Sequence, residues 1–384
     1  MKISKAARRI QPSLTRRLFD MAKEYDNVID FTLGDPDYKT PKKIIESAKR
    51  AMDEGKTKYS ANAGLPELRS IISDCIYNEN KVKYDPQSEI IVTVGAMEAL
   101  YLTLFCMLDP GDQVIIPAPY WINYVHMVQM CGGVPIIIDS YESNNFIVDI
   151  NDIKNAITEK TTAIILNSPN NPTGTVYDKN TVLELCETAK KNDIMIVWDE
   201  CYKSILYDDT EFVSVLDAPD VKSHAVIINS CSKKFSMTGW RIGYAAAPSE
   251  LVSNMTKIQE NLVACAPLPS QYAAIEAFRG DIDTKYMLDG FTKRRNKLVE
   301  GINGINKLSC KYPKGTFYAF VNIKRTGLGS EKFAYRLLES QQVAVVPGIT
   351  YGDCCEGFIR IAYTVDEDKI EEGIRRIRRF IQEL

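Results

Sequence analysis

The segment from Ser230 to Arg241 carries side chains with a clear chemical use. It begins Ser-Cys-Ser-Lys-Lys, and Arg241 follows eight residues after Lys233. Hydroxyl groups such as those of Ser230 and Ser232 donate hydrogen bonds and a guanidinium adds charge-assisted ones, so this set suits a phosphate group. A neutral lysine amine beside such a site can condense with an aldehyde to form a Schiff base. We therefore expect Lys233 to be a nucleophile next to an anion site, and a polar loop with a solvated lysine is the ordinary alternative.

A second candidate for anion binding lies at Gly95. This glycine separates the apolar run 90–94 from the helical stretch 96–107. The first backbone N–H groups of a helix have no partner within the helix, so those of about Ala96 and Met97 are expected to point at an anion. A simple turn between a strand and a helix is the alternative.

Three side chains suggest a site for a flat ring. Asp199 ends the apolar run 194–198, and a buried carboxylate needs a partner. That partner is either a protonated ring nitrogen, which would make the ring a better electron sink, or an internal cap or ion pair. Tyr202 can donate a hydrogen bond to a ring hydroxyl, and Trp121 offers a face for stacking, although core tryptophans are common.

Two further features concern recognition of polar substrates. The turn-rich segment around Asn171 is rich in asparagine and proline and predicts a rigid loop that presents amide side chains. Arg360 lies inside the apolar run 358–362. An arginine in such a place is either paired internally or available to bind a carboxylate through two hydrogen bonds.

The elements that must position these groups alternate between short apolar strands and helices. Near-continuous apolar runs are typical of strands that are buried on both faces. The fold class is therefore α/β, with a mostly parallel central sheet and helices on both faces. The carboxyl ends of such strands form one edge, where ligands bind. The predicted strands are 90–94, 113–117, 134–138, 162–166, 194–198 and 225–229.

A different pattern begins near residue 285 and predicts a smaller α+β domain. It has a charged helix at 286–301, strands at 316–323, 343–346 and 358–362, and a C-terminal helix from residue 366. The N-terminal segment has no strand series and is expected to pack with this smaller domain. The predicted division is residues 1–48 as an arm and part of the small domain, 49–284 as the large domain and 285–384 as the small domain.

Composition excludes several other classes of protein. A net charge of −3 and only two histidines disfavour a nucleic-acid binder, a zinc site and a Ser-His-Asp triad. No metal is expected. The basic N-terminus lacks the apolar core of a signal peptide, and no window approaches the roughly 18 apolar residues of a membrane span, so we expect a cytoplasmic protein without membrane contact. The ten cysteines are expected to be free thiols.

Taken together, these segments resemble the fold-type I pyridoxal-phosphate aminotransferases of class I/II, the group with aspartate, aromatic and alanine aminotransferases. The resemblance runs along nearly the whole chain. It is carried by SCSKKFSMTGWRIGY, which is similar to the family's Schiff-base signature and is highly specific, and by NSPNNPTG, WDECY, LGDPDYKTP and YSANAGLPELR. The LGDPDYKTP segment departs from the family pattern, with Asp35 in place of the usual glutamate and Tyr38 in place of the usual phenylalanine.

The resemblance implies pyridoxal 5′-phosphate as cofactor, L-amino acid and 2-oxo acid substrates, ping-pong amino transfer and a homodimer with shared active sites. Lys233 would carry the cofactor and act as the catalytic residue. The implied cofactor-binding residues are Tyr59 (from the partner subunit), Ala96, Met97, Trp121, Asn171, Asp199, Tyr202, Ser230, Ser232, Lys233 and Arg241. The implied substrate-binding residues are Gly34, Trp121, Asn171 and Arg360.

The substrate stays open at this point, although 2-oxoglutarate is a reasonable acceptor. Some aspartate-using relatives carry a lysine just after the phosphate-loop glycine, whereas this chain has Ala96 and Met97 there, which weakens an aspartate assignment. Aromatic, alanine-type, other neutral and N-acylated diamino acid donors are all compatible, and Arg16 or Arg17 could reach an acidic side chain. The rival functions are a carbon-sulfur β-lyase on the same fold and a non-catalytic cofactor-binding regulator; a dehydrogenase is disfavoured because no G-x-G-x-x-G follows a strand.

Overall fold

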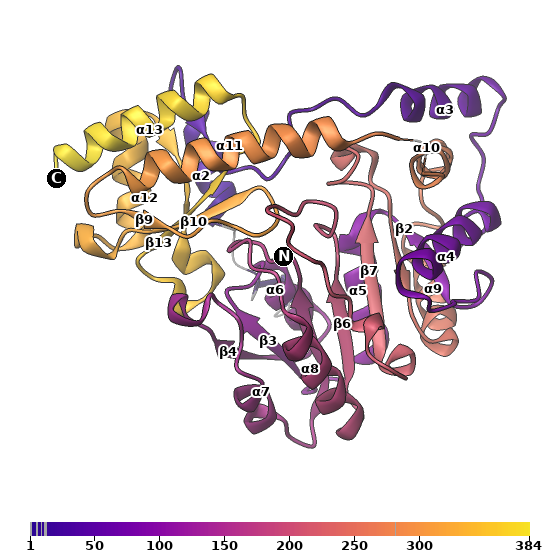
Figure 1. The fold of residues 1–384 in the computed structure, drawn as a ribbon. Helices are drawn as coiled ribbons and strands as arrows, with labels where there is room; N and C mark the ends of the chain where they lie inside the picture. Colours follow the sequence, from indigo (N-terminus) through magenta and orange to yellow (C-terminus); the bar gives the residue numbers. More distant parts are fainter. Residues whose placement is uncertain (1, 5–6, 9, 11–13, 281) are drawn as a thin grey trace.

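The computed structural model describes residues 2–4, 7–8, 10, 14–280 and 282–384. Within this part of the chain, seven strands form the central sheet, and all neighbours are parallel except those of β8, which runs antiparallel to β2 and β7 (Figure 1). Six of the strands were predicted, and β8 was not. The sheet order is β2 (Ile90–Thr93), β8 (Gly243–Ala246), β7 (Ala225–Ser230), β6 (Met195–Asp199), β5 (Thr161–Asn167), β3 (Gln113–Ala118) and β4 (Val134–Asp139).

Helices cover both faces of this sheet, as the apolar runs predicted. Successive residues of a strand point to opposite faces, so Ile164 and Leu166 of β5 belong to one hydrophobic cluster and Ala163 and Ile165 to another. The first face is covered by α4 (Pro66–Asn80), α7 (Ile150–Ala156), α8 (Lys179–Lys191) and α10 (Leu268–Phe278). The second face is covered by α5 (Gly95–Met107), α6 (Asn123–Met130) and α9 (Ser249–Leu262).

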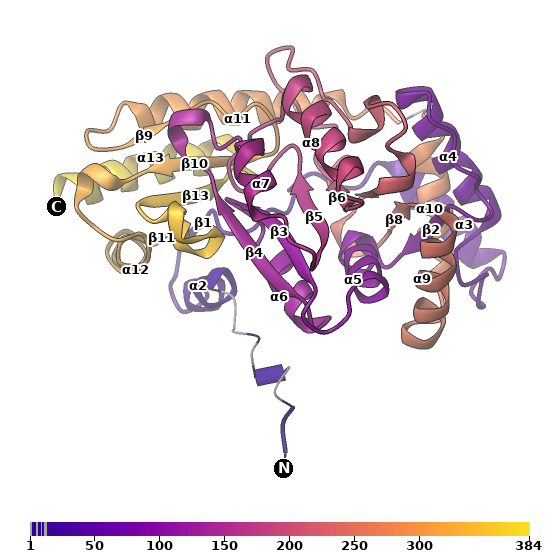
Figure 2. The same ribbon diagram turned by 90° about the horizontal axis from the view of Figure 1, so that it is seen from below.

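The smaller domain packs helices against a four-stranded antiparallel sheet (Figures 1 and 2). Its core includes Phe291, Phe317, Phe333 and Phe380, all of them buried. The predicted strand 343–346 is divided into two short strands that belong to different sheets. The elements are α11 (Lys285–Asn303), β9 (Ser309–Cys310), β10 (Tyr318–Asn322), α12 (Ser330–Gln341), β11 (Val343–Ala344), β12 (Val346–Pro347), β13 (Phe358–Ala362) and α13 (Glu367–Gln382).

The N-terminal segment contacts both domains. Helix α2 (Leu14–Ala22) and strand β1 (Ile29–Asp30) join the small domain, where β1 pairs in parallel with β11. Helix α3 (Lys42–Asp53) packs instead against α10 of the large domain, and it spans the predicted boundary at residue 48. The domain boundaries themselves stay predictions.

Residues 29–40 connect the two domains through a series of hydrogen bonds. The Phe31 N–H donates to the Ala344 carbonyl at 2.9 Å, on the small-domain side. Further along, the Thr238 hydroxyl donates to Asp35 at 2.7 Å, and the Thr40 hydroxyl donates to the Ser236 carbonyl at 2.6 Å. This segment, which we call the connecting segment, therefore runs beside the loop that carries Lys233.

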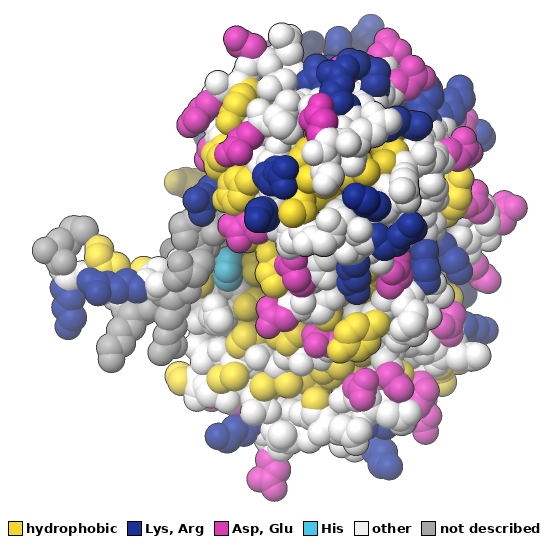
Figure 3. Space-filling view, turned by 90° about the vertical axis from the view of Figure 1, so that its left-hand side faces the viewer, with side chains coloured by type: hydrophobic (Ala, Val, Ile, Leu, Met, Phe, Trp, Pro, Cys, Tyr) yellow, Lys and Arg dark blue, Asp and Glu magenta, His cyan; other side chains and the backbone are white. Residues whose placement is uncertain are grey.

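Charged side chains of both signs cover the surface. On the face shown in Figure 3, lysines and arginines are interspersed with aspartates and glutamates. Among the residues that the structure describes, no helix combines the length and the apolar character that a bilayer crossing requires.

Candidate active site

A cavity of about 330 Å³ lies where the carboxyl ends of β5, β6 and β7 meet the small domain. The parallel strands deliver Asn167, Asp199 and Ser230 to one edge, and the register pairs Asn167 with Asp199. All of the predicted site residues except Tyr59 line this cavity: Gly34, Ala96, Met97, Trp121, Asn171, Asp199, Tyr202, Ser230, Ser232, Lys233, Arg241 and Arg360. Tyr59 is 88% exposed and lies outside it.

The amine of Lys233 is inside the cavity, whereas Lys234 turns away and lines other hollows. Lys233 Nζ donates to the Gly34 carbonyl of the connecting segment at 2.7 Å. No carboxylate of the described chain lies within ion-pair distance of it, and a carbonyl leaves its charge uncompensated. The amine is therefore held in place by a hydrogen bond and not by an ion pair.

Asp199 supplies a fully buried carboxylate. Its Oδ2 accepts a hydrogen bond from the Tyr124 hydroxyl at 2.7 Å, and its Oδ1 accepts one from the Cys201 N–H at 3.0 Å. Burial raises the pKa of Asp199, and the two hydrogen bonds and the charge of Lys233 oppose that rise. No cationic side chain in the described residues forms an ion pair with Asp199, so a buried charge is left with room for a cationic partner.

Positive charge lies on another side of the cavity, at Arg241 and the start of α5. Its guanidinium donates to the Thr238 carbonyl at 2.9 Å and has no carboxylate partner in the part of the chain described. It lies against the start of α5, where a Cβ added to Gly95 would meet Arg241 Nη2 at 2.4 Å. A φ of +77° at Gly95 also favours glycine. The guanidinium and the positive end of the helix dipole thus converge, which is a strong attraction for an anion.

Arg360 is the remaining cation at the cavity, and it is 95% buried, since its exposed fraction is 5%. Its Nη1 donates to Asn171 Oδ1 at 3.0 Å and its Nη2 donates to the Thr32 carbonyl, while its Nε has no hydrogen-bond partner in the described residues. The guanidinium also lies 4.3 Å from the centre of the Tyr318 ring. All of these partners are neutral, so the charge of Arg360 is available for a carboxylate.

Tyr202 and Tyr318 form a buried pair of phenols between these groups. Their hydroxyl oxygens are 3.0 Å apart. Burial, and after it the neighbouring Tyr318, raises the pKa of Tyr202 well above its usual range, so Tyr202 stays protonated and can donate. The Tyr318 hydroxyl also fills the space beside Gly34, where an added Cβ would lie 1.7 Å from its oxygen.

Several residues of the cavity were not predicted from the sequence. They are Thr32, Leu33, Ile122, Asn123, Tyr124, Asn167, Cys201, Thr238, Tyr318 and Tyr351. Tyr124 had only a weak signal, because it lies three residues after Trp121; the turn that leads into α6 brings the two rings to 5.5 Å. Tyr318 had none, since an aromatic residue in an apolar strand is ordinary core composition.

The remaining candidates lie elsewhere. His126 and His224 do not line the cavity, and all ten cysteines are free. Arg17 is stacked 5.6 Å from the centre of the Tyr335 ring, while the side chain of Arg16 lies outside the described part. Nowhere in the described ranges do three or more His, Cys, Asp or Glu side chains gather as a metal site.

Comparison with known proteins identifies the class to which this fold and site belong. The family described as aminotransferase class I and II matches residues 26–377. An aspartate aminotransferase of Pyrococcus abyssi is 38% identical over 377 residues, which cover 97% of each chain, and an aromatic-amino-acid aminotransferase of Thermococcus litoralis is 35% identical over 386 residues, which cover 100% of this chain and 99% of the relative. The solved structure of a Thermus thermophilus aspartate aminotransferase with maleate superimposes with a TM-score of 0.93 at 34% identity and covers 99% of both chains.

The chain therefore belongs to the class I and II aminotransferase family and is an aminotransferase. Members of this family generally use pyridoxal phosphate.

Proposed function

We propose that this aminotransferase uses pyridoxal 5′-phosphate carried by Lys233, and that it moves an amino group from an L-amino acid to a 2-oxo acid, with 2-oxoglutarate as an expected acceptor. One observation carries the proposal. A single cavity contains an uncompensated amine, a buried carboxylate without a cation, and two guanidinium groups without carboxylate partners.

The residues present fit this cofactor. Arg241 with the amino end of α5 offers an anion site, and Asp199 offers a negative charge for a protonated ring nitrogen. Tyr202 and Asn171 are buried donors for a ring oxygen, and Trp121 lies at the cavity wall. The residues proposed to hold the phosphate are Ser230, Ser232, Arg241 and the backbone amides of Ala96 and Met97.

When bound, the cofactor supplies an electron sink that makes the α-hydrogen of the substrate acidic. The chain supplies the rest. Arg360 holds the substrate carboxylate, with Gly34, Asn171 and Trp121 close to it in the cavity. Lys233, whose amine is already within the cavity, moves the proton at the substrate Cα. Burial keeps water from the charges of Asp199 and Arg360 and from the hydroxyl of Tyr202, which strengthens these interactions.

We also propose a homodimer in which Tyr59 reaches the phosphate site of the partner subunit. The support is that Tyr59 is almost fully exposed and outside its own cavity, and that large apolar side chains are exposed on α5 and at the end of α9: Met97, Phe105, Leu262 and Val263. Sedimentation at micromolar concentration would give a mass of two chains, and a monomer would contradict this part of the proposal.

The test of the proposed function compares two adjacent lysines. Lys233→Ala loaded with pyridoxal phosphate should lose the visible absorbance of the lysine-bound cofactor and its half-reaction with amino acids, whereas Lys234→Ala should keep both. A borohydride-trapped adduct on another lysine would refute the assignment. Release of pyruvate and ammonia from cystathionine without an added acceptor would identify the β-lyase instead.

A further inference from the structure

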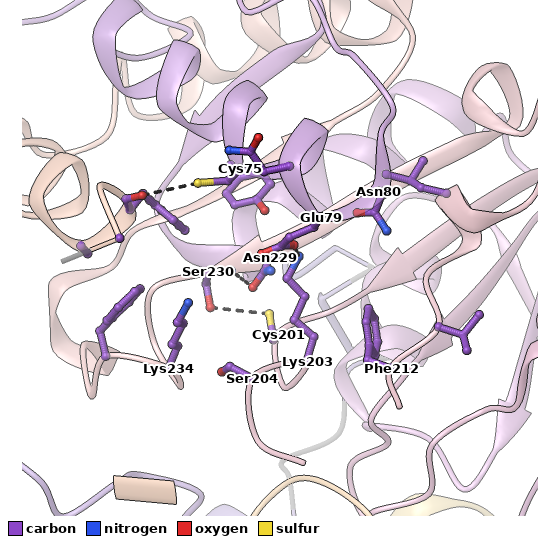
Figure 4. A pocket seen from close by; sticks show the side chains of 18 of the residues that line it. Cys75, Glu79, Asn80, Cys201, Lys203, Ser204, Phe212, Asn229, Ser230 and Lys234 are labelled. Atoms are coloured by element: carbon purple, nitrogen blue, oxygen red, sulfur yellow. Dashed lines mark hydrogen bonds and ion pairs between the residues drawn. The ribbon is translucent and has the colours of Figure 1, made fainter. Parts of the chain in front are cut away.

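A second and larger cavity, of about 950 Å³, lies behind the wall that Cys201 and Ser230 form in the first cavity. It is lined by the last turns of α4, the loop after β6 and the end of α10. Figure 4 shows Glu79 of α4 and Lys203 of the loop on its wall. Cys201 and Ser230 line both cavities, so the two are separated by a wall one residue thick at these positions. None of the proposed catalytic steps uses this second cavity.

The acceptors and the cation deep in the second cavity are already paired. Lys203 Nζ donates to Glu79 at 2.6 Å and to Glu200 at 3.0 Å. The other oxygen of Glu200, which is 99% buried with an exposed fraction of 1%, accepts the Ser214 hydroxyl. This network pairs Lys203 with Glu79 and Glu200, while the other two carboxylates that line the cavity, Glu211 and Asp217, are exposed to solvent.

Two donors in the same wall are not paired. Asn229 is 7% exposed and Tyr244 is 2% exposed, yet neither Asn229 Nδ2 nor the Tyr244 hydroxyl has a hydrogen-bond partner within the described residues. Burial raises the pKa of Tyr244 far above its usual range, so its hydroxyl remains a donor. The Lys234 ammonium, at the exposed side, is also without an ion pair in the described chain. Both donors reach the cavity and are not sealed off from it, so they are available to a ligand that offers oxygen acceptors.

We infer that the second cavity is a binding site for a small organic carboxylate with an aromatic or branched apolar body. The carboxylate would accept from Asn229 and Tyr244, with Lys234 adding charge. The body would lie on Phe212, Leu216 and Phe278, which line the same space. The volume is within the range of small-molecule sites. Filling by water alone is the competing outcome.

A ligand in the second cavity would affect the position of Ser230 in the wall of the first cavity. Asn229 Oδ1 accepts a hydrogen bond from the Ser230 N–H at 2.7 Å, so the amide that would bind the carboxylate also positions Ser230. Ser230 also lines the first cavity, and its hydroxyl accepts a hydrogen bond from the Ser232 N–H at 3.4 Å. A ligand on Asn229 Nδ2 therefore fixes a residue of the proposed phosphate site, which makes the second cavity an effector site.

The test uses 4-fluorophenylacetate and the cofactor-loaded protein, with binding followed by fluorine NMR. The background is Arg360→Leu, which removes the carboxylate anchor of the first cavity. In this background the probe should still bind. Tyr244→Phe should weaken it roughly three- to tenfold, as expected for one hydrogen bond. Ser204→Trp, which fills the cavity, should abolish binding, and the matched control Tyr286→Phe, an exposed tyrosine, should change nothing.

Loss of all binding in Arg360→Leu, or equal binding in the parent and Tyr244→Phe, overturns the site. Crystals soaked with the probe that contain only water at Asn229 and Tyr244 overturn it as well. The coupling is tested by the visible absorbance of the cofactor, which should shift when the probe saturates the Arg360→Leu protein. An unchanged band overturns the coupling, whereas absence of any band would count against the proposed cofactor instead.

Discussion

Replacing Tyr124 by phenylalanine removes one hydroxyl from the carboxylate at the centre of the site. That hydroxyl donates to Asp199 Oδ2 at 2.7 Å, and both side chains are buried. A hydrogen bond to a charged group contributes about 1.5–3 kcal/mol, and one to a neutral group about 0.5–1.5 kcal/mol. The cost of Tyr124→Phe should therefore depend on whether Asp199 is ionised.

The direction of the pH dependence follows from the raised pKa of Asp199. A carboxyl group with a raised folded-state pKa stabilises the protein most below its unfolded value, 3.8, and that contribution is lost as the pH rises through the folded value. Without the Tyr124 hydroxyl, the folded-state pKa of Asp199 rises further. The variant therefore loses more of its free energy of unfolding than the parent does as the pH rises and Asp199 ionises. The free energy of unfolding should differ from that of the parent by about 1.5–3 kcal/mol at neutral pH, and by roughly half as much once Asp199 is protonated.

Urea unfolding of the cofactor-free protein across a pH series would measure this difference. Carbon NMR of labelled aspartate would follow the titration of Asp199, whose signal is identified by its absence in Asp199→Asn. Tyr120→Phe is the control, because Tyr120 is a nearby tyrosine that does not line the first cavity. A pH-independent difference between Tyr124→Phe and the parent, or a lowered pKa of Asp199, would refute the reasoning. In the loaded enzyme, we expect kcat to fall about ten- to hundredfold with little change in KM.

Three further outcomes are expected. Arg360→Leu should raise KM for amino acids by about two orders of magnitude in steady-state kinetics, and Arg360→Lys should recover little of this, because a point charge does not replace a two-pronged donor. Tyr318→Phe should alter the pH titration of the cofactor absorbance through Tyr202, whereas Tyr318→Leu should also raise KM, because the ring that supports the guanidinium is lost. Gly95→Ala should weaken cofactor binding in an equilibrium titration far more than Gly55→Ala, since both glycines have positive φ but only Gly95 has an arginine where the methyl group would lie.

Much of the fold could be predicted because its signals are local. Strands buried on both faces are continuous apolar runs, and five of the six predicted strands are of this kind. The sixth, β4, is an equally apolar run at the edge of the sheet, where Val134 and Ile137 stay exposed. Strand β8 was missed because Gly243–Ala246 is small and short, with little β-branched character. Its antiparallel direction depends on the return of the chain after Arg241, which no local pattern records.

The site residues also fall into those that local sequence signals predict and those that depend on long-range packing. Residues at the carboxyl ends of parallel strands, such as Asp199 and Ser230, could be grouped from topology alone. Tyr318 and Thr32 could not, because Tyr318 reaches the cavity from the small domain and Thr32 from the connecting segment, and the packing of these parts on the large domain is a long-range property. The second cavity was likewise invisible, since it is built from α4, α10 and a loop that are far apart in the sequence.

The connecting segment has a mechanical consequence. Strand β1 is bonded to β11, so any rotation of the small domain must displace residues 29–31 with it. Three residues later, the Gly34 carbonyl accepts a hydrogen bond from the Lys233 amine. A rotation of the small domain relative to the large domain therefore displaces the Gly34 carbonyl. The length of the hydrogen bond from Lys233 Nζ to this carbonyl then depends on how far the two domains have closed.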